Sequence, residues 1–155
     1  MAENPHHKEL LQALNDYEVE YLIVGGYAVM KYTEPRYTKD LDVWVHNSPH
    51  NSVRLFEALV KFGAPLKHDR ITPDTFSQAN LVYQIGVAPV RIDILTHITG
   101  VQFTDAWRNR VETTFFGIPV HVISIDDLIT NKQAAGRSTD LEHLKHIRKE
   151  IGKKE

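Results

Sequence analysis

The sequence predicts an α/β (α+β) fold in which helices pack on a mixed β-sheet. Two features lead to this prediction. Apolar runs of strand length alternate with longer segments whose apolar residues recur at helical spacing. In addition, two pairs of apolar runs meet at glycine and proline, around Gly86 and Pro89 and around Gly117 and Pro119, as is typical of antiparallel hairpins. The composition does not shift along the 155 residues, so a single domain is expected over residues 1–155.

The first half of the chain is predicted to form three helices and two strands. The helices are expected around residues 10–14, 27–32 and 50–62, and the strands over 20–24 and 40–46. Leu10, Leu11 and Leu14 give the opening helix an apolar stripe. The pair Ser48–Pro49 starts the third helix and Gly63 ends it, because proline suits the first helical turn and glycine suits the position after the last.

The second half is predicted to form two hairpins and three helices. The strands are expected over 80–86, 90–96 and within 111–123, and the helices near 104–110, over 124–136 and from 139 onward. Residues 64–78 are expected to be loop. Ser124 with Asp127, and Thr139 with Glu142, have the spacing of capping boxes that start the last two helices.

Two aspartates stand inside the apolar run 40–46. Side chains of a strand alternate between its faces, so Asp40 and Asp42 are expected on one face, roughly 6–7 Å apart. Neighbouring carboxylates raise each other's pKa unless a cation lies between them. Mg²⁺ prefers carboxylate oxygens, water and substrate phosphate. The pair therefore predicts a divalent metal site. Trp44 and His46 share this face; Trp44 is expected to pack against protein and His46 to lie at the surface.

A third aspartate, Asp93, interrupts the apolar run 90–96. If that strand neighbours the strand 40–46, Asp93 joins the other two acids, and a third carboxylate is what a site for two ions roughly 3.5–4 Å apart usually needs. The alternative is that the three acids form salt bridges with Arg36, Lys39 or Arg91 and bind no metal.

Gly25 and Gly26 lie between a predicted strand and a predicted helix, where backbone N–H groups and the helix dipole can hold phosphate. The turn is not a Walker A loop, because the required Gly-Lys-Ser/Thr does not follow. Arg36 lies in the loop before the aspartates, and Lys132 and Arg137 can close over a triphosphate from the other side. Each of these cations can equally be an ordinary surface charge.

Composition excludes several other classes of protein. No apolar run approaches the roughly 20 residues of a membrane span, and the N-terminus lacks the features of a secretory signal, so a cytoplasmic protein is expected. The absence of cysteine excludes disulfides, thiolate catalysis and cysteine-ligated zinc. The net charge of −2 gives no strong attraction to nucleic acid, but the basic C-terminal segment 137–154 is either a solvated face or a site for an acidic polymer such as RNA.

The motifs LIVGGYAV, RYTKDLDVWV and VRIDIL, in this order, resemble the polymerase-beta-like nucleotidyltransferase superfamily. Its pattern is Gly-Gly or Gly-Ser after an apolar residue, then D-x-D, then a third acid on a later strand. Gly25, Gly26, Asp40, Asp42 and Asp93 match it position by position, although many members carry serine in place of Gly26. The tail ISIDDLITNKQAAGRSTDLEHL is similar to a narrower group of small bacterial proteins related to AbiEii-type toxins. The resemblance spans about residues 17–147.

The resemblance implies the nucleotidyltransferase type of mixed sheet and an enzyme that uses Mg²⁺ or Mn²⁺. Such an enzyme moves a nucleoside monophosphate from an NTP to a hydroxyl of an RNA, such as tRNA, or of a partner protein. Asp40 and Asp42 would hold both metal ions, and Asp93 would complete the site of the ion that activates the acceptor hydroxyl. The resemblance also implies a role in a toxin–antitoxin system.

Two other functions fit parts of the same pattern. A non-catalytic module of the same fold would bind an NTP and a partner without releasing pyrophosphate. A metal nuclease would use clustered aspartates but would not need the glycine turn to hold a triphosphate. The three acids together with the glycine turn favour the transferase.

Overall fold

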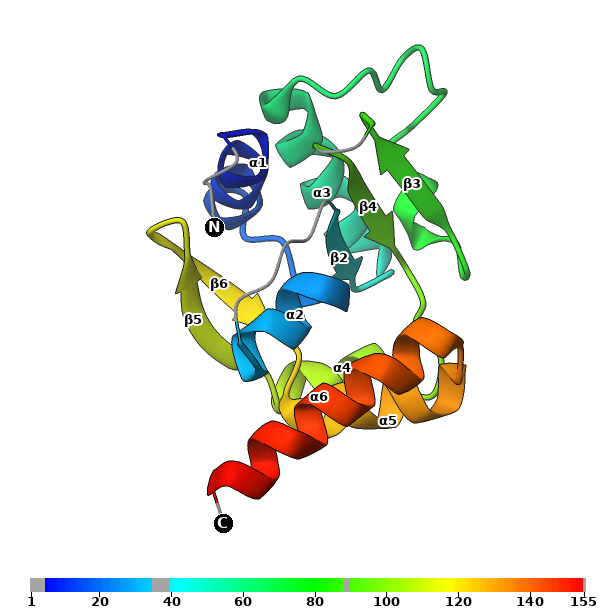
Figure 1. Ribbon diagram of the computed structural model, residues 1–155. Coiled ribbons are helices and arrows are strands. Elements are labelled where there is room, and N and C mark those ends of the chain that lie inside the picture. Colours follow the sequence, from blue (N-terminus) through cyan, green and yellow to red (C-terminus); the bar gives the residue numbers. More distant parts are fainter. Residues whose placement is uncertain (1–4, 35–39, 88–89, 155) are drawn as a thin grey trace.

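A computed structural model describes residues 5–34, 40–87 and 90–154, and in it the strands form one six-stranded sheet of order β3-β4-β2-β1-β6-β5 (Figure 1). The strands are β1 (Tyr21–Val24), β2 (Leu41–Val45), β3 (Val82–Ile85), β4 (Ile92–Leu95), β5 (Val111–Phe115) and β6 (Ile118–Val122). β2 runs parallel to β4, and β1 runs parallel to β6. The other neighbours are antiparallel, including the two predicted hairpins β3–β4 and β5–β6. The predicted mixed sheet is therefore confirmed.

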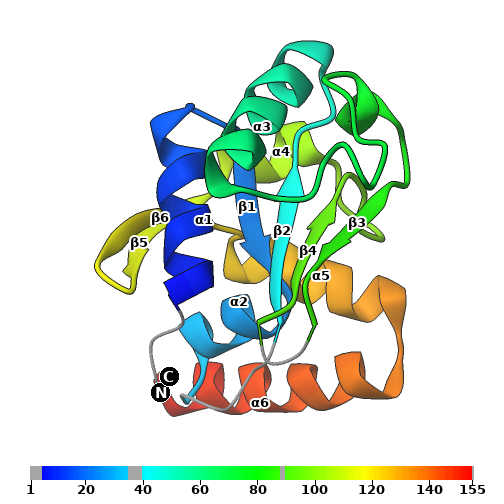
Figure 2. The same ribbon diagram turned by 90° about the horizontal axis from the view of Figure 1, so that it is seen from above.

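Helices cover both faces of the sheet and one of its ends. They are α1 (Pro5–Asp16), α2 (Gly25–Tyr32), α3 (Pro49–Phe62), α4 (Phe103–Arg108), α5 (Ile125–Ala135) and α6 (Ser138–Lys154). α1 and α3 lie on one face and α4 and α5 on the other, while α2 and α6 lie at the end where β1 stops and β2 begins (Figures 1 and 2). None of the helices in the described part of the chain is long and apolar enough to cross a membrane.

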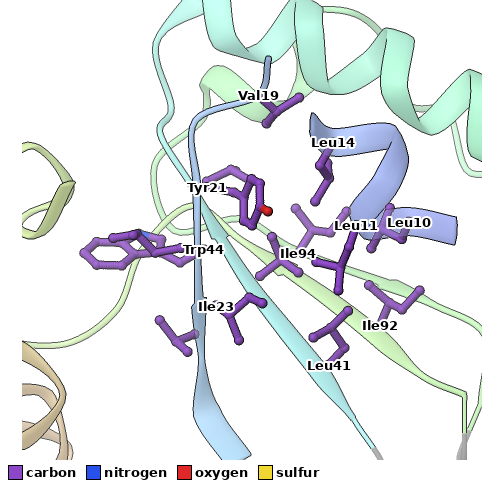
Figure 3. Packing of buried hydrophobic residues seen from close by; sticks show 14 of the residues in the cluster. Leu10, Leu11, Leu14, Val19, Tyr21, Ile23, Leu41, Trp44, Ile92 and Ile94 are labelled. Carbon is purple, nitrogen blue, oxygen red and sulfur yellow. The ribbon is translucent and has the colours of Figure 1, made fainter. Parts of the chain in front are cut away.

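Part of the hydrophobic core lies between α1 and the sheet (Figure 3). The predicted stripe of α1, Leu10, Leu11 and Leu14, is fully buried there. It packs over side chains from β1, β2 and β4 that point to the same face, namely Tyr21, Ile23, Leu41, Ile92 and Ile94. Burying this apolar surface, at about 25 cal/mol per Å², fixes β1, β2 and β4 relative to one another, and the three aspartates and the glycine turn lie at the shared end of these strands.

The opposite face of β2 is closed at one end and open at the other. Trp44 is 1% exposed and meets the ring of Phe103 edge-on, with centroids 5.1 Å apart, so its predicted packing role is confirmed. His46 stacks on the same ring and its Nδ1 lies 2.8 Å from Oε1 of Glu20. Only the end of β2 that carries the aspartates is left for a site.

Four local predictions were wrong in detail. α2 begins at Gly25, two residues earlier than predicted, so the glycines form its first turn. The second hairpin turns at Phe116 and Gly117, both at positive φ, while Pro119 lies inside β6. α6 begins at Ser138 without the predicted capping box of Thr139 and Glu142; instead the carboxylate of Asp140 accepts the backbone N–H of Arg137 at 3.1 Å. A 3-10 helix, Thr75–Ser77, interrupts the predicted loop.

Candidate active site

The three aspartates meet at the end of the sheet near α2. β2 and β4 are neighbours, and Asp42 pairs in register with Asp93, so the two side chains project from the same face. Asp40 directly precedes β2 and stands two residues before Asp42, so both lie on the same face of the extended chain. Asp40, Asp42, Asp93 and the neighbouring Arg91 are called the carboxylate cluster below. The sequence analysis expected Asp93 to join the other acids if its strand neighboured the strand of Asp42. The pairing of β2 with β4 confirms this condition.

The glycine turn touches this cluster directly. Val24, the last residue of β1, pairs with Asp42, and the chain then turns at Gly25 with φ of 65°. A Cβ at Gly25 would collide with the Asp42 carboxylate and lie 2.9 Å from its Cγ. Gly25 is therefore required twice, by its left-handed backbone and by the close approach of Asp42. Gly26 follows in the first turn of α2 and is half-buried.

A pocket of about 560 Å³ opens over the cluster. Its wall contains the carboxylate cluster, the first glycine of the turn and two cations from the opposite side. These residues are Gly25, Asp40, Asp42, Arg91, Asp93, Lys132 and Arg137. Parts of the segment 95–99 and of α5 complete the wall. The structure thus brings together all of the predicted site residues that it describes, except that Gly26 lies beside the pocket wall. Arg36 lies outside the described residues.

The surroundings of Asp42 disfavour the charged form of its carboxylate. Burial raises its pKa, and the negative charges of Asp93 and Asp40 raise it further, to about 7. The positive charge of Lys132 opposes this shift only in part. A carboxylate in this state gains from any cation that enters the pocket.

Among the residues that the structure describes, Arg91 is the cation that forms ion pairs with two of the three aspartates, Asp40 and Asp93. Its Nη2 lies 3.0 Å from Oδ2 of Asp93 and 3.3 Å from Oδ2 of Asp40. The sequence offered Arg91 as a salt-bridge partner that would replace a metal. One guanidinium cannot neutralise three carboxylates, so the cluster keeps a surplus of negative charge.

A second group of charges, the basic cluster of Lys132, Arg137 and Asp140, lies across the pocket where α5 meets α6. Asp140 is fully buried and accepts from Lys132 Nζ at 3.1 Å and from Arg137 Nε at 2.7 Å. Burial acts to raise the pKa of Asp140, but these hydrogen bonds outweigh it and lower the pKa to about 2. Lys132 is buried, whereas the Arg137 side chain is 73% exposed and keeps N–H donors free for a ligand.

Asp140 was missed by sequence reasoning, which placed the capping box of α6 elsewhere. The signal that could have found it is an acid three residues after Arg137 in the first turn of a helix, where a carboxylate can bond back to the cap. Its contact with Lys132 depends on the angle between α5 and α6. The sequence does not give that angle.

The chemistry of the carboxylate cluster fits a divalent cation. Oδ1 of Asp93 is buried and accepts no hydrogen bond from a donor in the described residues, and Asp42 has a raised pKa; both indicate missing positive charge. Carboxylate oxygens are the ligands that Mg²⁺ and Mn²⁺ prefer. Within the described ranges, however, no three His, Asp or Glu side chains already have the arrangement of metal ligands.

A mixed sheet with acids on adjacent strands, a glycine turn at the next strand and cations facing them defines a nucleotide-transfer type of site. The chain belongs to the family described as "Nucleotidyl transferase of unknown function (DUF2204)", whose model matches residues 5–155. Membership of a nucleotidyltransferase family is thereby established, while the relation to AbiEii-type toxins stays a prediction. No curated protein sequence matches the chain at a significant level.

The fold recurs in a solved structure from Thermotoga maritima. That protein, TM1012, is described as a "putative nucleotidyltransferase". The two chains superpose with a TM-score of 0.57 over 95% of this chain and 91% of the other, at 12% sequence identity. At that identity the likeness shows that the fold is shared, and the arguments about chemistry rest on the residues of this chain.

Proposed function

We propose that this protein is a nucleotidyltransferase that depends on Mg²⁺ or Mn²⁺ and transfers a nucleoside monophosphate from an NTP to a hydroxyl of an RNA. The observation that carries the proposal is the in-register pair Asp42–Asp93, with Gly25 packed against Asp42 and two cations across the same pocket. In the reaction the acceptor oxygen bonds to the α-phosphorus of the NTP. The bond from that phosphorus to the bridging oxygen breaks, and pyrophosphate leaves.

The carboxylate cluster is the metal-binding half of the proposed site. Asp40, Asp42 and Asp93 would hold the divalent cation or cations, which when bound would neutralise charge on the triphosphate and lower the pKa of the acceptor hydroxyl. Asp93 is the best placed of the three to accept the proton of that hydroxyl, because its buried Oδ1 has no donor in the described part of the protein. The pairing of β2 with β4 would hold these ligands in fixed positions relative to one another.

The opposite wall is the phosphate-binding half. Backbone N–H groups in the first turn of α2, at Gly25 and Gly26, lack helical partners and can bind phosphate oxygens. Arg137 offers exposed guanidinium donors, and Lys132 adds a buried positive charge. Arg36 is proposed to join them as a further cation. Transfer would depend mostly on positioning and electrostatics, as in other phosphoryl transfers.

RNA is proposed as the acceptor because of the surface of α6, which continues from the basic cluster. Arg137, just before this helix, and Lys145, Arg148 and Lys149 on it are exposed. A pocket of about 620 Å³ along the helix is lined by Lys145, His146 and Lys149 together with Ser138, Leu141 and Glu142. Phosphates of a polynucleotide such as tRNA would bind cations spaced in this way. A partner protein is the alternative acceptor, and the similarity of the tail to small toxin-related proteins favours a toxin–antitoxin role in the cytoplasm.

A non-catalytic NTP-binding module is the second candidate, and one observation favours it. Arg91 already contacts Asp40 and Asp93, as expected if the acids form a structural ion pair. A module of this kind would bind nucleotide and a partner without turnover.

The test supplies each of the four α-labelled NTPs with Mg²⁺ and a cell lysate to the wild type and to Asp42→Ala. Label that ribonuclease removes supports RNA as the acceptor, and label that protease removes supports a protein. The variant should lose at least roughly 100-fold in transfer, because even the outer partners of metal ligands contribute 10–100-fold. Nucleotide binding by the wild type without any transfer would favour the non-catalytic module.

A further inference from the structure

Arg91 occupies the position in the carboxylate cluster where a cation is needed. It directly precedes β4 and stands two residues before Asp93, so both side chains project from the same face. A single nitrogen, Nη2, lies within 3.3 Å of both Asp40 and Asp93. The two oxygens that it contacts are ones that a bound divalent cation would use.

The remainder of the Arg91 guanidinium is not engaged in the same way. Its Nε is buried and has no hydrogen-bond partner among the described residues, and the side chain is 37% exposed at the pocket. A guanidinium carries five N–H donors, and planar pairs of them match phosphate oxygens as well as carboxylates. Arg91 therefore has unused donors beside the space proposed for the triphosphate.

A divalent cation and the Arg91 guanidinium would compete for Asp40 and Asp93, because two positive charges on the same carboxylates repel each other. Mg²⁺ binds its ligands at about 2.0–2.1 Å, so it would approach these oxygens more closely than Nη2 does. A triphosphate bound with the metal would offer Arg91 a new anion. The guanidinium of Arg91 could then exchange a carboxylate for a phosphate without leaving the pocket.

We propose that Arg91 is a positioning residue with two alternative partners. Without ligand it holds Asp40 and Asp93 in place of the cation; when metal and nucleotide bind, it moves from these carboxylates to the triphosphate. This inference rests on the proposed function. It implies that Arg91 opposes binding of the metal alone and promotes binding of the metal with a polyphosphate, two effects of opposite sign that a fixed structural ion pair would not produce.

The experiment measures two affinities for wild type, Arg91→Gln, Arg91→Lys and the control Arg108→Gln. The affinity for Mn²⁺ alone is read from the electron paramagnetic resonance signal of free Mn²⁺. The affinity for inorganic tripolyphosphate is measured by calorimetry in excess Mn²⁺, which avoids any preference for a base. Arg108 is 77% exposed on α4, and its removal makes the same change of net charge outside the pocket.

Arg91→Gln should bind Mn²⁺ roughly fivefold more tightly, as expected from removing a competing, partly exposed ion pair. It should bind tripolyphosphate roughly tenfold or more weakly, because a charge-assisted hydrogen bond is lost. Arg91→Lys should keep a near wild-type affinity for Mn²⁺, since the charge remains, which separates charge from packing. Arg108→Gln should change neither affinity by more than the small effect of net charge.

Weaker or unchanged Mn²⁺ binding in a folded Arg91→Gln would overturn the inference, as would unchanged binding of tripolyphosphate. Both results leave the proposed transferase intact provided that the wild type binds Mn²⁺. If neither the wild type nor Arg91→Gln binds Mn²⁺, the metal site and the role of Arg91 fail together.

Discussion

The carboxylate cluster and the basic cluster face the same pocket with opposite imbalances of charge. In the first, three acids lie beside one arginine that pairs with two of them; in the second, two cations share one acid. The effect on the acids is opposite as well, since the pKa of Asp42 is raised to about 7 and that of Asp140 is lowered to about 2. One wall of the pocket therefore lacks positive charge and the other lacks negative charge. A divalent cation bound to a polyphosphate supplies both.

The largest effect predicted from this comparison is on stability at neutral pH without metal. The folded state holds the Asp42 proton more tightly than the unfolded chain, so the free energy of unfolding falls as the pH rises from the ordinary carboxyl range to about 7 and then levels off. Asp42→Asn cannot ionise and escapes this loss. A shift from 3.8 to about 7 corresponds to at most about 4 kcal/mol.

Urea unfolding in a chelator, from about pH 4 to about pH 8, measures this difference. Asp42→Asn should gain on the wild type as the pH rises. The exposed Asp105→Asn provides the control, because its side chain is 63% exposed and lies on α4. A constant difference between Asp42→Asn and wild type over this range would show that Asp42 ionises normally.

In the basic cluster, removal of the acid should cost stability instead. Asp140→Asn leaves Lys132 buried without its carboxylate partner, and breaking a buried ion pair in this way costs about 3 kcal/mol. The double variant Asp140→Asn with Lys132→Met removes both charges and should recover a large part of that loss. Chemical denaturation of the three proteins gives the comparison; a loss below about 1 kcal/mol for Asp140→Asn is the value of a solvated pair and would contradict the assignment.

Gly25 allows a smaller but cleaner test of the contact between turn and carboxylate. Gly25→Ala should destabilise by about 2 kcal/mol or more, from left-handed strain together with the collision with Asp42. Gly117→Ala is the matched control, because Gly117 has a similar φ of 77° and no atom near the added Cβ. It should lose only the strain, about 1–2 kcal/mol. If Gly25→Ala and Gly117→Ala lose the same stability and bind nucleotide equally well, Gly25 is only an ordinary turn residue.

Much of this arrangement could be predicted from the sequence because it depends on local rules. Period-two alternation placed Asp40 and Asp42 on one face, and the apolar surroundings of Asp93 indicated that it lies on a strand of its own. The prediction that Gly63 and Gly136 end helices is also confirmed, since both adopt the left-handed conformation at the C-cap. These signals lie within a few residues of the feature that they predict.

The balance of charge in the pocket could not be predicted in the same way. Arg91 is close to Asp93 in sequence, but its bridge to Asp40 requires the parallel pairing of β2 and β4. Asp140 reaches Lys132 only because α5 and α6 turn back on each other at Gly136. Both contacts depend on the packing of elements, and they decide which cations are free to bind a ligand.

The most direct test of the opposite balance of charge is the effect of Mg²⁺ on thermal unfolding at about pH 8, where Asp42 is ionised. At a free Mg²⁺ concentration about ten times Kd, binding to the folded state adds about 1.4 kcal/mol, which is a rise in Tm of about 3–6 °C for a chain of this size. We expect this rise in Tm for the wild type. Asp42→Asn should have a higher Tm than the wild type without metal, and Mg²⁺ should raise its Tm little further. An unchanged Tm of the wild type in Mg²⁺, or an equally large rise in the Tm of Asp42→Asn, would contradict the proposed lack of positive charge around Asp42.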